Sequence, residues 1–337
     1  LVEKRLMQSG KMPPPEKLLW FKWEATFTWI SGMMLLIAAY YLTGGAYLVD
    51  PAVANITVPV AVGISFGLVF VSWFVYDTLW QTIGKKSTRV GTALSLLLLV
   101  GLTYGLCHTL SGRAAYIHVG AILGTLMVAN VWVRILPNQQ RMFDAATAGQ
   151  VPDYSQGKYA KIRSLHNSYM TFPVIFMMIS NHYAHTFGNA QNWLVLILLM
   201  IFGAGIRHWM ICAERKTPAN WVLLPVLASF LTLLWMTFPK AKTQPVAEGG
   251  QDRIALSQVQ TIMANRCISC HSSTPTDDVF TSAPKGTMFE TPDQIRSQAK
   301  LIKVMVVDST AMPLGNKTKM TDEERAIVGK WIDQNIK

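Results

Sequence analysis

The pattern C-I-S-C-H at residues 267–271 is the part of this sequence that most directly indicates a chemistry. In a C-x-x-C-H pattern each thiol adds to one vinyl group of a porphyrin, and the histidine becomes an axial ligand of the iron. A methionine downstream lies where a small cytochrome supplies the second ligand. A histidine–methionine pair raises the potential of the iron and suits it to accept electrons. The sequence therefore predicts one covalent haem c bound by Cys267, Cys270, His271 and Met312.

Zinc or a reduced cysteine pair is the alternative use of these thiols. A zinc site needs further thiolates or histidines nearby, and the sequence has neither after residue 271. The flanking segments also favour a haem domain. Residues 252–266 have the apolar pattern of a helix, and Thr321 with Glu324 forms a capping box before a last amphipathic helix. Residues 251–337 are therefore predicted to form a small class I cytochrome c domain.

The composition of the chain is that of a membrane protein. Of its 337 residues, 51% are hydrophobic and only 15% are charged. Seven apolar segments are each close to the roughly 20 residues that cross a bilayer as a helix; they cover residues 23–43, 54–76, 90–110, 113–136, 164–187, 191–212 and 219–238. The predicted fold is therefore all-α, with a polytopic transmembrane helix bundle over 1–239, a polar linker over 240–250 and the cytochrome c domain.

The basic residues between these segments predict the orientation of the bundle. One set of loops carries sixteen of them, and the alternate loops carry only Arg113; the sixteen are Lys4, Arg5, Lys11, Lys17, Lys22, Lys85, Lys86, Arg89, Arg134, Arg141, Lys158, Lys161, Arg163, Arg207, Arg215 and Lys216. Because basic loops stay in the cytoplasm, the first set is predicted to be cytoplasmic and the C-terminus extracytoplasmic. Membrane orientation thus explains the net charge of +11 without nucleic-acid binding.

Histidines inside the apolar segments are further candidates, because ionisable residues are costly in a membrane and usually have a function there. His118 and His182 lie at similar predicted depth near the outer surface, and His166 and His208 lie near the cytoplasmic boundary. Histidine pairs at matching depth on different helices can bind b-type haem, so each pair is a candidate ligand set for a non-covalent haem b. The alternative is interfacial histidines that hydrogen-bond to backbone, water or lipid headgroups.

Other polar side chains gather near the cytoplasmic boundary. Arg163, His166 and Asn167 begin one apolar segment, and Asn130 and Arg134 share a face of the helix before it. Arginine and amide groups can hold a planar anion through hydrogen bonds. Arg163, His166 and Asn167 are therefore candidate catalytic residues, a role that for His166 is the alternative to haem ligation. Snorkelling at a membrane boundary explains Arg134 well, but it explains Asn130 and His166 less well.

Several stretches of the sequence resemble one known family. They are F-K-W-E at 21–24, Y-I-H-V-G-A at 116–121, P-N-Q at 137–139, the run 163–173 and S-N-H-Y at 180–183. Together, and in this order, they are similar to the bacterial membrane-bound urate hydroxylase, which joins an integral-membrane urate oxidase domain to a C-terminal cytochrome c. The similarity extends over about 16–337. Members of that family begin with one more transmembrane helix, so an eighth helix before residue 1 is expected.

The resemblance implies an enzyme of the bacterial inner membrane, with its cytochrome c domain on the periplasmic side. Urate would be oxidised to 5-hydroxyisourate, and the electrons would pass to haem c and then to a soluble cytochrome c or a terminal oxidase. The expected partners are therefore urate, that electron acceptor and the lipid bilayer, but no nucleic acid. Two other functions stay open: a quinol-handling membrane cytochrome, and a non-catalytic anchor for a cytochrome. An anchor needs one transmembrane helix rather than seven.

Overall fold

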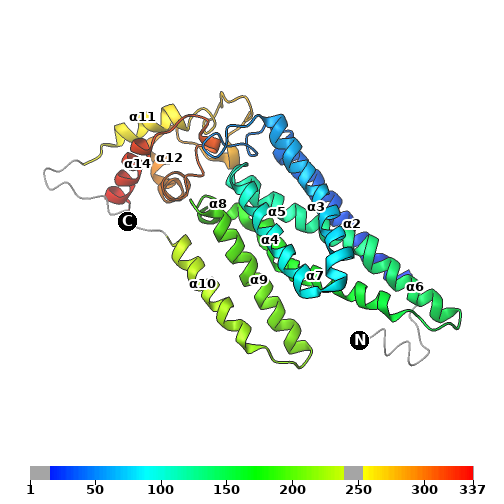
Figure 1. Cartoon of the computed structure of the whole chain (residues 1–337). Coiled ribbons are helices and arrows are strands. Elements are labelled where there is room, and N and C mark those ends of the chain that lie inside the picture. Colours follow the sequence, from blue (N-terminus) through cyan, green and yellow to red (C-terminus); the bar gives the residue numbers. More distant parts are fainter. Residues whose placement is uncertain (1–15, 239–252, 337) are drawn as a thin grey trace.

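The structure is a computed structural model that describes residues 16–238 and 253–336, with side chains described from residue 22. All regular secondary structure within these two ranges is helical, which confirms the all-α prediction. Residues 16–238 form a helical bundle, and residues 253–336, called here the C-terminal region, lie at one end of it (Figure 1). The linker predicted at 240–250 falls outside the described residues.

Helix α5 (Gly112–Ala129) lies at the centre of the bundle and packs against its neighbours on several sides. The long helices around it are α2 (Glu16–Leu36), α3 (Val58–Lys86), α4 (Thr88–Cys107), α7 (Tyr154–Ile179), α9 (Asn192–Glu214) and α10 (Leu223–Thr237). Small and apolar residues occupy all faces of α5, so most of its side chains are buried. Helix α10 packs along α9 at the edge of the bundle.

Within the described residues, five helices are long and apolar enough to cross a membrane, so the chain is a multi-pass membrane protein. They span Val58–Lys86, Thr88–Cys107, Gly112–Thr147, Asn192–Glu214 and Asn220–Thr237. The other two predicted spans, 23–43 and 164–187, also form long helices, α2 and α7. These two are not among the five, because polar residues such as His166 and Asn167, together with charged ones such as Arg163, lower their mean hydropathy.

The segment predicted as a loop at 137–163 is largely helical. Helix α5 continues through the π-helical η2 (Asn130–Ile135) into α6 (Leu136–Thr147), and α7 begins at Tyr154. Residues 136–147 are too polar to appear in an apolar pattern, and Pro137 lies in the first turn of α6, directly after the π-helical segment. Asp153 then caps α7 by accepting a hydrogen bond from the backbone of Ser155, at 2.9 Å.

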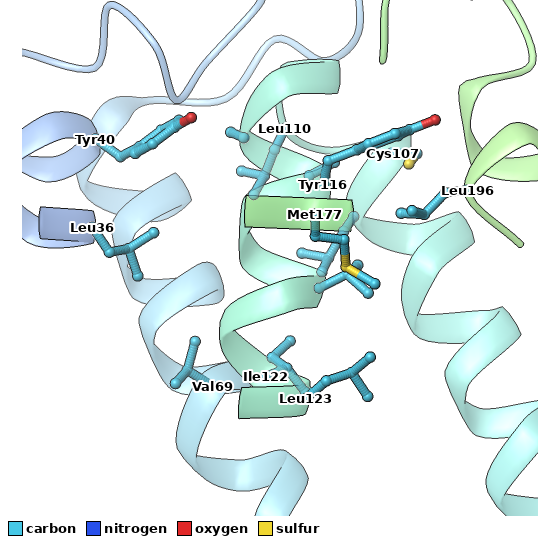
Figure 2. Packing of buried hydrophobic residues seen from close by; sticks show 14 of the residues in the cluster. Leu36, Tyr40, Val69, Cys107, Leu110, Tyr116, Ile122, Leu123, Met177 and Leu196 are labelled. Carbon is cyan, nitrogen blue, oxygen red and sulfur yellow. The ribbon is translucent and has the colours of Figure 1, made fainter. Parts of the chain in front are cut away.

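A close approach of α5 and α7 depends on a glycine. A Cβ added at Gly120 would lie 2.9 Å from the Cβ of Met177, so a larger residue would push the two helices apart. Met177 is buried with Tyr116 and Leu196 in the main core (Figure 2). Gly120 therefore permits the close packing of α5 and α7, whereas Gly124 faces open space.

The C-terminal region has a hydrophobic core of its own. Its helices are α11 (Leu256–Arg266), α12 (Pro292–Ser297), α13 (Ala299–Ile302), the π-helical η6 (Lys303–Asp308) and α14 (Asp322–Asn335). Val259 of α11 and Trp331 of α14 are buried in this core, where the two helices pack together. The predicted capping box is confirmed, because Thr321 and Glu324 each bond to the backbone of the other at the start of α14.

The two ends of the bundle differ in what they carry. The inner end consists of the turns at 86–88, 147–154 and 214–220 and includes Lys85 and Lys86. The outer end consists of the connections at 42–57, 107–112 and 180–192, and the C-terminal region lies against it (Figure 1). The short helix α8 (Ala184–Phe187) contacts η6 there. The C-x-x-C-H motif and the basic turns are therefore at opposite ends of the molecule.

Candidate functional site

The C-x-x-C-H motif forms a compact turn at the end of α11. The backbone N–H of Cys267 donates to the carbonyl of Met263 at 2.8 Å, and that of His271 donates to the carbonyl of Cys267 at 2.8 Å. Cys267 is buried and Cys270 is half-buried. Burial raises the pKa of the Cys267 thiol to about 12, so this cysteine is a neutral thiol in the free protein.

The imidazole of His271 is held by a hydrogen bond to the backbone. Its Nδ1 lies 2.9 Å from the carbonyl oxygen of Thr287, which can only accept a hydrogen bond, so Nδ1 carries the proton. The other nitrogen, Nε2, is thereby left with a lone pair, and a bond of this kind fixes a ligating histidine in place. Among the described residues no three His, Cys, Asp or Glu side chains gather to bind a metal ion. The donors therefore suit a haem better than zinc.

Met312 is half-buried beside the core of the C-terminal region. Its backbone N–H donates to the carbonyl of Met305 at 2.9 Å, and its carbonyl accepts from Nη1 of Arg325 at 2.6 Å. Arg325, which is buried, also donates to the carbonyl of Val306. This arginine holds the methionine segment in position, a role that its place in an amphipathic helix did not reveal. A thioether and an imidazole are the donors that a His/Met haem c needs, so the residues present fit that group.

A second cluster of polar residues lies in the inner half of the bundle. The carboxylate of Asp77, on α3, accepts from Nη2 of Arg163 at 2.7 Å and from Nε of Arg134 at 2.9 Å. Arg134 makes a further bond to Asp77 through Nη2. Arg163 is buried, and its guanidinium lies 4.7 Å from the centre of the Tyr76 ring. Two arginines thus share one carboxylate, which leaves the group with an excess of positive charge.

Tyr76 links the remaining members of this inner cluster. Its hydroxyl lies 2.6 Å from Nδ1 of His166 and accepts from Nδ2 of Asn130 at 3.3 Å. Asn130 also donates to Oδ1 of Asn167 at 2.8 Å. The structure therefore brings together Arg163, His166 and Asn167, although these three reach one another through Tyr76 and Asn130.

Two atoms of the inner cluster are buried without a hydrogen-bond partner among the described residues. They are Nη1 of Arg163, a donor, and Oδ1 of Asn130, an acceptor. Buried polar groups are nearly always paired, and an unpaired one calls for a ligand or water. Arg163 also lines a small hollow, together with Trp80, Arg134 and Tyr159. The inner cluster can thus offer one donor and one acceptor to a small polar molecule.

The other predicted histidines have separate surroundings. His118 is completely buried, with Nδ1 2.7 Å from the carbonyl of Ala114 and Nε2 3.0 Å from the hydroxyl of Tyr41. His182 is exposed, in the short 3₁₀ helix η3 (Ser180–His182). No hydrogen bond or ring contact between described residues joins these two histidines. Haem b on this pair stays a prediction, and its binding would replace the bond from Tyr41.

The inner histidines also bond to different partners. His166 contacts Tyr76 and Trp80, whose ring centroid is 4.2 Å away. His208 contacts Tyr169, whose hydroxyl is 2.6 Å from its Nδ1. Between the two roles expected for His166, its surroundings favour membership of the inner cluster over pairing with His208. Haem b at this second pair remains untested.

Sequence reasoning missed Tyr76 as a member of the inner cluster. It lies next to Asp77, but a tyrosine near a predicted membrane boundary is typical of an aromatic belt and gave no separate signal. Its partner His166 is 90 residues away in the chain.

Comparison with known proteins gives one match. The family model described as urate oxidase N-terminal matches residues 2–238. No curated protein and no solved structure matches the chain. The match covers the helical bundle with its inner cluster and ends before the C-terminal region.

Proposed function

Because the chain belongs to the urate oxidase N-terminal family, we propose that it is a membrane-bound oxidoreductase that oxidises urate to 5-hydroxyisourate. Its own haem c would receive the electrons and pass them to a soluble cytochrome c or a terminal oxidase. The observation that carries this proposal is the occurrence, in one chain, of the family match over 2–238 and of a C-x-x-C-H motif docked at the outer end.

The reaction balances without dioxygen. Urate and water give 5-hydroxyisourate, two protons and two electrons, as water adds at C5 of the oxidised purine. A haem c bound by Cys267, Cys270, His271 and Met312 would supply a one-electron acceptor, so the two electrons leave in succession. The protein must therefore bind urate, take up two protons and keep the electron donor and acceptor within reach of each other.

The inner cluster is the proposed urate site. The guanidinium of Arg163 would hold the urate anion, because its Nη1 is a buried donor with no other partner among the described residues. His166 would accept a proton, and Asn167 would fix the orientation of Asn130 through the bond at 2.8 Å. Charge-assisted bonds of this kind are strong where water is excluded.

Electrons released at the inner cluster must travel to the outer end. Asn130, the first residue of η2, lies twelve residues after His118 of α5, or about 18 Å along the helix at 1.5 Å per residue. From His118 a series of ring contacts continues outward: Tyr40 at 5.8 Å, then Tyr47 at 6.2 Å from Tyr40, and Phe280 at 6.0 Å from Tyr47. These rings would couple the bundle to haem c, and a non-covalent haem b on His118 and His182 is the other candidate carrier.

The proposed location is the bacterial inner membrane, with the inner end in the cytoplasm and the C-terminal region in the periplasm. Two features support this orientation. Basic residues concentrate at the inner end, and c-type haem is attached to proteins outside the bacterial cytoplasm. The C-terminal region, at the outer end, then faces periplasmic electron acceptors.

The decisive experiment mixes oxidised, detergent-purified protein with urate in the absence of oxygen and follows the haem c absorbance. Urate should reduce haem c, steady turnover should require an added acceptor such as cytochrome c, and hydrogen peroxide should not form in stoichiometric amounts. A matched sample receives a quinol in place of urate. Reduction by the quinol and not by urate would assign the protein to a quinol-handling function instead.

A further inference from the structure

The orientation of every group around Tyr76 follows from one backbone carbonyl. Nδ2 of Asn167 lies 2.9 Å from the carbonyl oxygen of Met127, which can only accept, so this end of the Asn167 amide is the donor. Oδ1 of Asn167 then faces Asn130 and accepts a hydrogen bond from Nδ2 of Asn130. The same Nδ2 donates to the hydroxyl oxygen of Tyr76. The hydrogen bonds therefore determine which end of the Asn167 and Asn130 amides is oxygen and which is nitrogen.

The direction of the bond between Tyr76 and His166 follows in turn. Because the Tyr76 oxygen accepts from Asn130, its own proton is free to point at Nδ1 of His166, 2.6 Å away. Nδ1 is thus an acceptor, and a neutral His166 carries its proton on Nε2. The Tyr76 hydroxyl can therefore donate its proton to His166 and accept another proton from a neighbouring group.

The two unpaired atoms of the inner cluster belong to residues that touch Tyr76. Oδ1 of Asn130 accepts and Nη1 of Arg163 donates, and both side chains are more than nine-tenths buried. A ligand that satisfies both must present an N–H group and a carbonyl oxygen along one edge. Urate has such edges, because ring N–H and C=O groups alternate around the purine. A ligand N–H that binds Oδ1 of Asn130 lies beside the amide that donates to the Tyr76 hydroxyl.

We propose that Tyr76 is a catalytic residue that takes a proton from bound urate as its own proton passes to Nδ1 of His166. This inference rests on the proposed function. In the step, an N–H bond of urate breaks, a new O–H bond forms on Tyr76, and the previous Tyr76 proton forms an N–H bond on His166. The electrons leave separately to the haem iron, so proton and electron transfer remain balanced.

His166 is in contact with a residue that lines the inner hollow. The ring of Trp80 is 4.2 Å from the imidazole, and Trp80 also lines the hollow that opens at the inner end. A His166 that has gained a proton on Nδ1 can release its Nε2 proton, which leaves a neutral imidazole with the remaining proton on Nδ1.

The test removes the hydroxyl and leaves the ring. Tyr76→Phe keeps the ring that packs against Arg163, so urate should still bind, whereas urate-driven reduction of haem c in a single turnover should fall by about 10²-fold or more. Binding is measured by calorimetry on protein whose haem c has already been reduced. Reduction of haem c by ascorbate should be unchanged.

A matched control exists in the same bundle. The hydroxyl of Tyr169 lies 2.6 Å from Nδ1 of His208, the same distance as in the Tyr76 pair, but among the described residues no hydrogen bond joins this second pair to Arg163 or Asn130. In the Tyr169→Phe variant, urate should therefore reduce haem c at close to the wild-type rate. Equal losses in the two Tyr→Phe variants would overturn the proposal.

A second variant guards against misfolding and tests the role of the imidazole. His166→Asn keeps an acceptor for the Tyr76 hydroxyl but cannot take a proton at neutral pH, so it should lose the rate to a similar extent. Since the two residues act as one unit, Tyr76→Phe/His166→Asn should be no slower than either single variant.

The outcomes separate this inference from the proposed function. Wild-type protein whose haem c urate cannot reduce would reject the proposed function. If urate reduces haem c in the wild-type protein, and reduces it equally fast in Tyr76→Phe or His166→Asn, the proposed function stands and the role of Tyr76 is rejected.

Discussion

Tyr47 and Phe280 meet edge to face, with ring centroids 6.0 Å apart and ring planes at 80°. Tyr47 belongs to the connection between α2 and α3, and Phe280 belongs to the C-terminal region, so this contact joins the two parts of the molecule. Met305 and Ala311 of the C-terminal region pack against the bundle core nearby. A Cβ at Gly188, after α8, would collide with the carbonyl oxygen of Ser309. The C-x-x-C-H motif is therefore held at the outer end by specific contacts.

Removing the Tyr47 ring should slow electron delivery across this interface. Tyr47→Leu loses the contacts with Tyr40 and Phe280, so urate should reduce haem c more slowly, while ascorbate should reduce it at the wild-type rate and the haem potential should not change. Tyr154→Leu, at an exposed position near the inner end, is the control for a lost tyrosine. An unchanged rate in Tyr47→Leu would show that electrons enter haem c elsewhere.

Covalent haem should depend on both cysteines of the motif. Intact mass spectrometry of the Cys267→Ala/Cys270→Ala variant should show the mass of one haem missing. Met312→Ala should retain the covalent haem but lower its potential and allow small ligands to bind the iron, because the thioether would be replaced by a weaker ligand. Haem that remains covalently bound in the double variant would refute the attachment site.

The ion pair between α11 and α14 should make the C-terminal region sensitive to acid. Nε of Arg266 lies 3.0 Å from both carboxylate oxygens of Glu324. Partial burial acts against ionisation, but the bond from Arg266 and the backbone N–H of Thr321 together hold the pKa of Glu324 below its usual value of 4.5. A carboxyl with a lowered folded-state pKa stabilises the fold above its unfolded pKa, and this contribution disappears as the pH falls through the folded value.

Glu324→Gln should accordingly lower the stability of this region by about 1 kcal/mol near neutral pH, since the pair is only partly buried. The difference from wild type should shrink below about pH 4.5. Thermal unfolding of the full protein, followed by the haem absorbance, measures both effects. Glu323→Gln, at the exposed neighbouring position in the same helical turn, should change the unfolding temperature less. A constant difference between pH 7 and pH 3 would contradict the assignment.

The predicted orientation can be tested with reporter fusions. A reporter that is active only in the periplasm should be inactive when fused after Lys86, in the turn between α3 and α4, and active when fused to the C-terminus. The opposite pattern would invert the bundle in the membrane. A reporter that is active only in the cytoplasm, fused at the same two positions, should give the reverse pattern and serves as the control for expression.

Apolar run length predicted where most helices lie, but not where they end. α3 extends to Lys86, ten residues beyond the predicted span, and α6 continues the helix of α5 with a polar sequence that no hydropathy pattern identifies. These extensions protrude at the inner end, where water and headgroups tolerate polar helix surfaces. Helix hydrogen bonds, rather than apolar burial, sustain them, so composition alone could not reveal them.

The candidate site was predictable in part for a related reason. Asn130, Arg163 and His166 stand out because polar residues interrupt apolar sequence, and the structure brings all three into one cluster. Tyr76 does not stand out, because a tyrosine is ordinary in such a sequence. Its importance comes from partners on two other helices, a tertiary relationship that the spacing of residues along one chain cannot show.

The free nitrogen of Arg163 should account for much of the affinity for urate. Arg163→Lys keeps a positive charge beside Asp77 but removes Nη1, the donor left without a partner. A hydrogen bond to a charged group is worth about 1.5–3 kcal/mol, so the dissociation constant for urate should rise by about 10- to 100-fold. Arg134→Lys is the matched control, because Arg134 shares Asp77 while its side chain is 31% exposed, against 5% for Arg163. Calorimetry on protein with reduced haem c measures both variants. If Arg134→Lys weakened urate binding as much as Arg163→Lys, the shared charge at Asp77 rather than the buried donor would determine recognition.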